Sequence, residues 1–157
     1  MSFTFSAELE PKIGALLLRY PTRRAALLPV LRLIQDEHGH ISADAERRVA
    51  EILDLTPINV REVVTFYTML TRSPVGRFHL QVCSNVSCGL AGGDRVSAYL
   101  QAKLGVRPGE TTPDGKYTLT EVECLGACDE APCMMVNFDF YGHLEAARVD
   151  EILDGLA

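Results

Sequence analysis

Apolar residues in the first 73 positions recur every three to four residues, which is the spacing of one face of an α-helix. Four such stripes follow one another, so this half of the chain is predicted to be a helical bundle. Pro29 lies within the second stripe, and we expect that helix to begin late or to kink there, before Gly39 closes it. The fourth helix is predicted to run to about Leu70. The first, third and fourth helices are expected to start at capping residues: Ser6, Ser42 and Thr56-Pro57.

The pattern changes after the segment Ser73-Pro-Val-Gly76. Residues 78–83 alternate between apolar and polar, which predicts a half-buried strand ending at Cys83. A helix is expected from the glycines at 89–93 to about Leu104, and a second strand over residues 117–124. An apolar strand over 133–138, a hairpin at 139–142, a strand over 141–144 and a terminal helix complete the pattern. We therefore predict an α+β chain, with a helical domain at residues 1–73 and an α/β domain at residues 74–157.

Composition narrows the class of protein. The chain has 157 residues, 47% of them hydrophobic, and a net charge of −6 without any basic block or stripe. Nucleic-acid binding is therefore not expected. The apolar runs are too short for a membrane span, and the N-terminus lacks the pattern of a secretory signal. We expect a cytoplasmic protein without direct membrane insertion, although it can still belong to the peripheral part of a membrane complex.

Four of the five cysteines form two close pairs. Cys83 and Cys88 have the spacing C-x4-C, and Cys124 and Cys128 have the spacing C-x3-C. Each pair begins where a predicted strand ends, so neighbouring strands can bring the four thiols to one edge of a sheet. In a reducing compartment such pairs indicate metal binding rather than disulfides.

The spacing leaves two metal centres open. Four thiolates suit a tetrahedral zinc ion, and they equally suit a two-iron cluster with one pair on each iron. Small residues between the cysteines favour the cluster, because they let backbone N–H groups approach sulfur. These residues are Ser84, Ser87, Gly89, Gly126 and Ala127.

Several stretches of the chain resemble one family. They are Cys83-Ser-Asn-Val-Ser-Cys88, Thr112-Pro-Asp-Gly-Lys-Tyr-Thr-Leu119 and Glu123-Cys-Leu-Gly-Ala-Cys128 with Ala131-Pro132, together with Leu27-Leu-Pro-Val-Leu-Arg-Leu33, Gln35-Asp-Glu-His-Gly39 and Val63-Val-Thr-Phe-Tyr-Thr-Met69. These stretches are similar to the thioredoxin-like [2Fe–2S] ferredoxin family. Within it they resemble the branch that serves as the E-type subunit of bacterial NADH:quinone oxidoreductase (complex I).

The resemblance implies a thioredoxin-like fold for residues 74–157 and one [2Fe–2S] cluster. It implies that the cluster ligands are Cys83, Cys88, Cys124 and Cys128. It also implies that the chain is an oxidoreductase subunit without a complete active site of its own, passing single electrons between the cluster and the flavin of a partner. FMN and NADH are then bound by that partner, a subunit of the F type.

Further expectations follow from the same resemblance. The helical domain docks on the partner, other peripheral-arm subunits complete the assembly, and the complex holds the chain at the cytoplasmic face of the inner membrane. NAD-dependent formate dehydrogenases and hydrogenases use the same module, so an equivalent subunit of those enzymes is an alternative. A zinc-stabilised scaffold is the alternative from another class of protein.

Other side chains near the cysteine pairs carry weaker signals. Cys133 is either a buried core residue or a spare ligand near the cluster. His38 and His40 fit a helix end better than a metal site, and His79 is expected to serve packing or the surface. The acidic neighbours of the cysteines either lower the reduction potential of a cluster or form a solvated face: Glu121, Glu123, Asp129 and Glu130.

Overall fold

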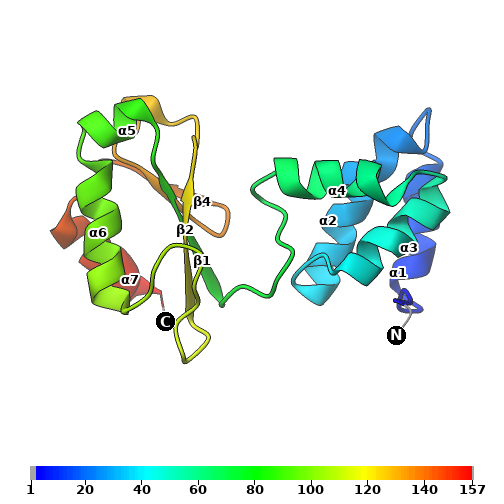
Figure 1. Cartoon of the computed structure of the whole chain (residues 1–157), viewed down its shortest axis with the longest axis horizontal. Coiled ribbons are helices and arrows are strands. Elements are labelled where there is room, and N and C mark those ends of the chain that lie inside the picture. Colours follow the sequence, from blue (N-terminus) through cyan, green and yellow to red (C-terminus); the bar gives the residue numbers. More distant parts are fainter. Residues whose placement is uncertain (1–2, 157) are drawn as a thin grey trace. The chain divides into compact units, whose positions relative to one another are not determined.

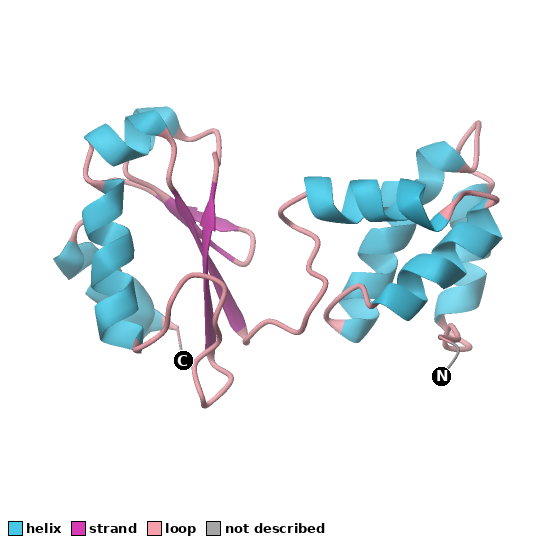
Figure 2. Ribbon diagram, in the orientation of Figure 1, coloured by secondary structure: helices cyan, strands magenta, loops and turns pink. Residues whose placement is uncertain are grey.

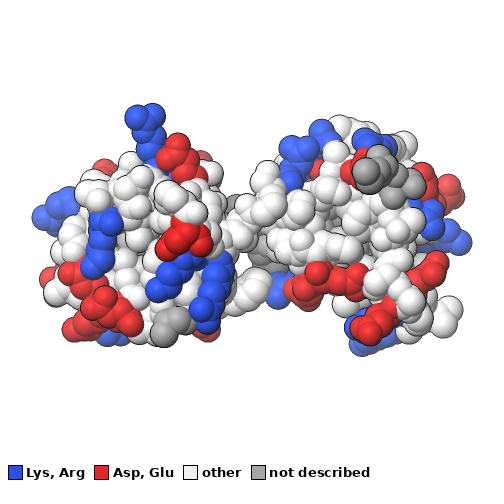
Figure 3. Space-filling model, turned by 90° about the horizontal axis from the view of Figure 1, so that it is seen from below, with Lys and Arg blue, Asp and Glu red and all other residues white. Residues whose placement is uncertain are grey.

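The computed structural model describes residues 3–156, and the chain divides into two compact units, Met1–Pro74 and Val75–Ala157 (Figure 1). The first unit is helical and the second contains a sheet flanked by helices, as Figure 2 shows. The predicted α+β class is therefore confirmed. Within the described part, no helix is both long and apolar enough to cross a bilayer. Figure 3 shows positive and negative side chains interspersed on the displayed face of each unit.

The first unit buries the apolar stripes of its helices in one core. The core draws on every helix of the unit and includes Leu31, Ile34 and Val49, none of which is exposed to solvent. The predicted helix count of four is confirmed, with a short 3-10 turn added before the second helix. The elements are α1 (Leu9–Leu17), η1 (Arg24–Ala26), α2 (Leu27–His38), α3 (Ala43–Leu53) and α4 (Pro57–Phe66).

Local signals account for most of the helix ends. Helix α2 begins late, as expected, so that Pro29 lies in its first turn, where a missing N–H breaks no helical hydrogen bond. Gly39 takes the left-handed conformation that ends α2, at φ 77°. The Ser42 side chain accepts a hydrogen bond from the Ala45 N–H and caps α3.

Helix α4 ends at Phe66, so the prediction that it continues to about Leu70 is wrong. The chain turns out of the helix at Tyr67 because a distant side chain binds the backbone beyond it. The Gln35 amide on α2 donates to the Met69 carbonyl at 2.7 Å and accepts from the Thr71 N–H at 2.7 Å. These two bonds hold the segment after α4, which turns at residues 68–69, against α2.

Glu46 on α3 is a buried carboxylate held by two guanidinium groups. It is 2% exposed and pairs with Arg61 of α4 at 2.7 Å and with Arg72 at 3.1 Å, whose side chains are 42% and 43% exposed. We expect Glu46→Gln to lower the free energy of unfolding by roughly 1–3 kcal/mol, less than for a fully buried pair because solvent reaches both arginines. Glu51→Gln, which removes an exposed partner of Arg48, is the control and should change it by less than about 0.5 kcal/mol in urea denaturation. Equal effects of the two changes contradict this role for Glu46.

The second unit is built on a sheet of four strands in the order β2-β1-β3-β4. Strand β1 pairs with β2 in parallel and with β3 antiparallel, and β3 pairs with β4 antiparallel. Helices α6 and α7 cover one face, where Leu80, Leu100 and Val149 meet in the core (Figure 1). The elements are β1 (Phe78–Cys83), α5 (Val86–Leu90), α6 (Gly93–Leu104), β2 (Tyr117–Val122), η2 (Cys128–Glu130), β3 (Met134–Val136), β4 (Asp139–Tyr141) and α7 (Ala146–Gly155).

Several predicted strand boundaries in this unit are wrong, because the strands expected over 133–138 and 141–144 are β3 (Met134–Val136) and β4 (Asp139–Tyr141). Strand β2 ends at Val122, the last residue paired with β1, so Cys124 lies two residues beyond the strand rather than at its end. The β3–β4 hairpin turns at Asn137 and Phe138 rather than at 139–142. Asn137 takes a left-handed conformation at φ 54°, and its side chain accepts from the His79 N–H at 2.9 Å. This bond pins the turn to the start of β1.

The predicted helix that runs to about Leu104 is confirmed as α6, and a short helix that was not predicted, α5, precedes it. Helix α5 already contains Cys88, and Gly92 at φ 102° separates it from α6. The side chain of Asn85 caps α5 by accepting from the Val86 N–H. A turn of helix therefore fixes the direction of the Cys88 side chain, which the sequence placed in a loop.

Candidate metal centre

The ends of β1 and β2 create the frame of the candidate site. The two strands are parallel, and Cys83 at the end of β1 lies opposite Val122 at the end of β2. Beyond this pair, the Ser84 N–H donates to the Val122 carbonyl at 2.9 Å and keeps the two chains together. The prediction that the two cysteine pairs follow neighbouring strands is thus correct, although Cys124 lies two residues beyond the end of β2.

Three thiols gather at this edge. Cys83, Cys88 and Cys133, which we call the buried thiol trio, are 1–2% exposed, and their sulfur atoms all lie within 4.8 Å of one another. The Sγ atoms of Cys88 and Cys133 are 3.6 Å apart. No two of the cysteines form a disulfide. Cys133 is buried, as the first expectation for it required, and it also lies beside Cys83 and Cys88, as the second required.

Cys124 and Cys128 lie outside the trio, on the segment we call the outer loop (residues 123–128), and both are exposed. The loop nevertheless contacts the trio. Leu125 and Ala127 pack against the buried thiols, and the Cys83 thiol lies 3.9 Å from the Glu123 carbonyl, to which it donates. The structure therefore brings together the first predicted pair and holds the second pair on a loop that covers it.

The loop also provides a backbone donor for sulfur. The Gly126 N–H lies 3.3 Å from the Cys124 sulfur atom and donates to it. Gly126 has a left-handed backbone at φ 75°, a conformation that a residue with a side chain rarely adopts. This agrees with the expectation that small loop residues let N–H groups reach the thiolates.

Burial and hydrogen bonding separate the pKa values within the trio. Burial raises the pKa of Cys88 and raises that of Cys133 to about 12. Burial acts on Cys83 in the same direction, but hydrogen bonds from the Asn85 and Leu125 backbone and from the other two thiols outweigh it and lower its pKa. Cys83 is therefore the member of the trio that most readily becomes a thiolate, the form that binds metals.

The acidic residues that flank the cysteines are all exposed: Glu121, Glu123, Asp129 and Glu130. The last two lie within η2. The Glu121 carboxylate also accepts a hydrogen bond from the Ser97 hydroxyl at 2.5 Å. Glu123 belongs to the outer loop, and the other three lie within two residues of it.

The histidines do not join the thiols. His38 is the last residue of α2 and packs edge-on against the Phe3 ring. His79 on β1 is buried, its ring nitrogen lies 2.8 Å from the Thr120 hydroxyl, and burial lowers its pKa. Within residues 3–156, the group of potential metal ligands that converges is the buried thiol trio.

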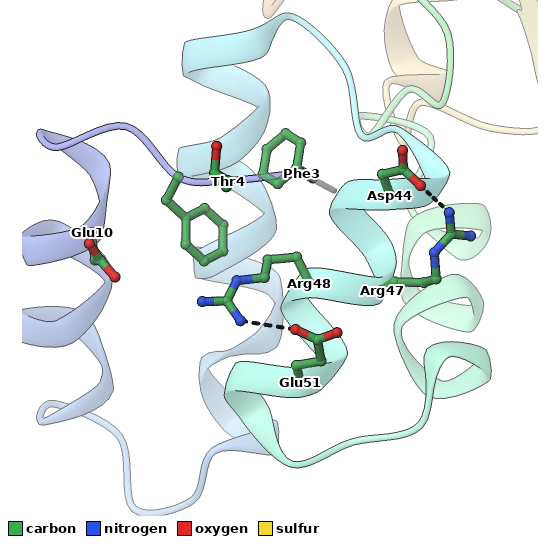
Figure 4. Close-up of a pocket in the computed structure, with 8 residues that line it drawn as sticks. Phe3, Thr4, Glu10, Asp44, Arg47, Arg48 and Glu51 are labelled. Carbon is green, nitrogen blue, oxygen red and sulfur yellow. Dashed lines mark hydrogen bonds and ion pairs between the residues drawn. The ribbon is translucent and has the colours of Figure 1, made fainter. Parts of the chain in front are cut away.

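A separate hollow in the first unit has both of its arginines in ion pairs (Figure 4). Arg47 pairs with Asp44, and Arg48 pairs with Glu51 at 2.9 Å. The Arg48 guanidinium also lies over the Phe5 ring, 5.5 Å from its centre. These contacts engage both cations of the hollow, whereas the thiols at the edge of the sheet are the group of potential metal ligands that converges among residues 3–156.

Comparison with known proteins decides the family. The model of the family described as "Thioredoxin-like [2Fe-2S] ferredoxin" matches residues 13–157. The chain belongs to the thioredoxin-like [2Fe–2S] ferredoxin family. The resemblance seen in the sequence is thereby confirmed, and the family carries a [2Fe–2S] cluster as its cofactor.

Relatives of this ferredoxin carry the names of NADH-quinone oxidoreductase or NADH dehydrogenase proteins. The chain is 49% identical over 146 residues to a protein of Rhizobium meliloti that is named as an E-type component of NADH-quinone oxidoreductase, covering 93% of this chain and 87% of the relative. It is 42% identical to subunit 2 of the corresponding enzyme of Thermus thermophilus, covering 88% and 78%. It is 43% identical to the mitochondrial "NADH dehydrogenase [ubiquinone] flavoprotein 2" of Dictyostelium discoideum, covering 97% and 63%.

A solved structure supports the fold. A chain of an NAD+-reducing [NiFe]-hydrogenase matches 83% of this ferredoxin with a TM-score of 0.69 at 24% identity, and the match covers 22% of that longer chain. Because the identity is low, this likeness concerns the fold.

The residues at the sheet edge fit the cluster of this family. A [2Fe–2S] cluster takes four cysteine thiolates, and this chain offers one buried pair and a second pair on a loop in contact with it. The Gly126 N–H donates to the Cys124 sulfur, a kind of contact that tunes sulfur ligands of metal centres. Cys133 gives the site a fifth thiol, which is a feature beyond the expected donor set.

Proposed function

We propose that this ferredoxin is the electron-transfer subunit of an NADH:quinone oxidoreductase, in which Cys83, Cys88, Cys124 and Cys128 hold one [2Fe–2S] cluster. The observation that carries the proposal is the pairing of a buried C-x4-C with an outer C-x3-C at one sheet edge, in a chain 49% identical to a relative named as a component of that enzyme. When bound, the cluster supplies reversible one-electron chemistry.

The protein would contribute the thiolate ligands, apolar side chains that shield the buried pair from water, and an exposed side at which electrons can be exchanged. Cys83 and Cys88 would hold the inner iron in a site closed to solvent, while Cys124 and Cys128 would hold the outer iron near the surface. The apolar side chains of Leu125 and Ala127 pack beside the buried pair and exclude water from it. An exposed outer half gives a short path for an electron to or from a docked partner.

The proposed partner is a flavin-bearing subunit that binds NADH and FMN and exchanges single electrons with the cluster. The helical unit would provide much of the docking surface, and other peripheral-arm subunits would hold the assembly at the cytoplasmic face of the inner membrane. Relatives named as NADH-quinone oxidoreductase subunits at 42–49% identity favour this assembly over a formate dehydrogenase or hydrogenase.

Metal and sulfide analysis of the anaerobically purified full chain tests the proposal. We expect about two irons and two sulfides per chain, a visible spectrum that bleaches with dithionite, and an electron paramagnetic signal after reduction. Re-oxidation by an oxidised flavin subunit would then test the exchange of electrons. One zinc ion per chain and no visible absorption, in protein that has never been exposed to air, would contradict the proposed electron carrier and favour a zinc-stabilised scaffold.

The carboxylates of η2 should tune the cluster. An electron added near Asp129 and Glu130 is repelled by their charges, so we expect Asp129→Asn with Glu130→Gln to raise the midpoint potential. Because both side chains are exposed, the shift should be modest and should shrink as salt is added. Glu151→Gln with Asp154→Asn on α7 makes the same change in charge and serves as the control in a redox titration. An equal shift in both variants, or a fall in the first, contradicts a local effect.

A further inference from the structure

The buried thiol trio has the spacing that a single metal ion requires. In a tetrahedral site with metal–sulfur bonds of about 2.3 Å, neighbouring sulfur atoms lie about 3.8 Å apart. The Sγ atoms of Cys88 and Cys133 are 3.6 Å apart, and all three sulfur atoms of the trio lie within 4.8 Å of one another. Small rotations of the side chains would bring the third sulfur to the same spacing.

Backbone contacts fix the positions of the three cysteines. The Cys83 N–H donates to the Cys133 carbonyl at 3.1 Å, which fastens the end of β1 to the residue before β3. The Leu144 N–H donates to the Pro132 carbonyl at 3.0 Å and fixes the other side of Cys133. Gly93 at the start of α6 lies so close to Cys88 that an added Cβ would sit 2.9 Å from its carbonyl oxygen. A site fixed in this way loses little entropy when it binds an ion.

The outer pair is separate from this arrangement. Cys124 and Cys128 are exposed, and it is the intervening Leu125 and Ala127 that turn toward the trio. A mononuclear site formed from the trio therefore needs no rearrangement of the outer loop.

We propose that Cys83, Cys88 and Cys133 form a mononuclear site for a thiophilic, tetrahedral divalent ion such as Zn²⁺, with a water in the fourth position. Each thiol that binds gives its proton to solvent, so three thiolates and one ion leave a net charge of −1 on the site. Two members of the trio are also proposed cluster ligands. A bound ion and a [2Fe–2S] cluster therefore exclude each other. Cys133 is a ligand of the mononuclear ion and not of the proposed cluster.

Cobalt is the probe for this site, since Co²⁺ takes the same geometry as Zn²⁺ and shows sulfur-to-metal charge transfer that grows with the number of thiolates. The full chain, reduced and freed of metal under anaerobic conditions, is titrated with Co²⁺, and Zn²⁺ then displaces it. We expect one ion per chain. Cys133→Ala should remove about one third of the charge-transfer intensity, as one thiolate in three is lost, and weaken binding at least about tenfold.

The matched control is Cys124→Ala with Cys128→Ala, which removes two thiols and should leave the intensity and the affinity nearly unchanged. Cys133→Ser puts a hydroxyl in place of the thiol, so its agreement with Cys133→Ala ties the loss to the sulfur atom. Circular dichroism checks the fold of each variant. The proposal is overturned if the control loses more affinity than Cys133→Ala, or if the unaltered chain binds no ion. Neither outcome touches the proposed cluster, which iron and sulfide analysis tests separately.

Discussion

Cys88→Ala is expected to abolish the [2Fe–2S] cluster, whereas Cys133→Ala keeps it. The two side chains are each 1% exposed and lie side by side, with their sulfur atoms 3.6 Å apart. Removing either sulfur therefore leaves a similar small cavity, with a similar cost to stability of roughly 1 kcal/mol. Only the proposed ligand should change the cofactor, because a cluster needs four thiolates, two on each iron.

The measurement is iron and sulfide content with the visible spectrum, on protein reconstituted anaerobically. Cys128→Ala extends the comparison to the outer loop, since its side chain is exposed and its loss leaves no cavity. We expect less than about a tenth of the iron of the unaltered chain in Cys88→Ala and Cys128→Ala, and nearly full iron in Cys133→Ala. If Cys133→Ala loses the cluster while Cys128→Ala keeps it, the ligand set is the buried thiol trio with one outer cysteine.

The sequence predicts this fold well where the signals are local. Ser42, Gly39 and Thr56-Pro57 act through their own backbone and neighbours, and the helices begin or end where these residues place them. The end of α4 depends instead on Gln35, some thirty residues away in the chain, and the hairpin turn depends on a bond between Asn137 and His79. No local pattern contains such bonds, so both boundaries were wrong.

In the candidate site, too, some features follow from local sequence and others depend on contacts between distant segments. The spacing of Cys83 and Cys88, and their place after a strand, point to a metal site directly. The position of Cys133 follows from the pairing of β1 with β3, which brings its carbonyl to the Cys83 N–H. An extra cysteine after Ala131-Pro132 could be noted in the sequence, but its convergence with the first pair is a property of the sheet order.

Gly93→Ala is expected to displace the backbone of the two inner cysteines, Cys83 and Cys88, and so to weaken the metal site. A Cβ at this position would lie 2.9 Å from the Cys88 carbonyl oxygen and 3.2 Å from that of Cys83, and both are backbone atoms that cannot rotate away. Either α6 or the cysteine backbone must move, so the free energy of unfolding should fall by about 1–3 kcal/mol. Because the displaced atoms belong to two proposed ligands, iron retention during chelator challenge should fall as well.

Gly89→Ala is the matched control, one residue after Cys88 in the same helix. An added Cβ there meets nothing within 4 Å, so the variant should be neutral or gain up to about 1 kcal/mol from reduced backbone freedom. Urea denaturation of the metal-free chains, followed by iron release from the reconstituted ones, separates the two effects. Equal stability and equal iron release in the two variants would mean that the contact between α6 and the cysteine backbone does not position the thiols. A loss confined to Gly93→Ala means that α6 presses the two inner cysteines into place, so the site depends on the packing of the whole unit.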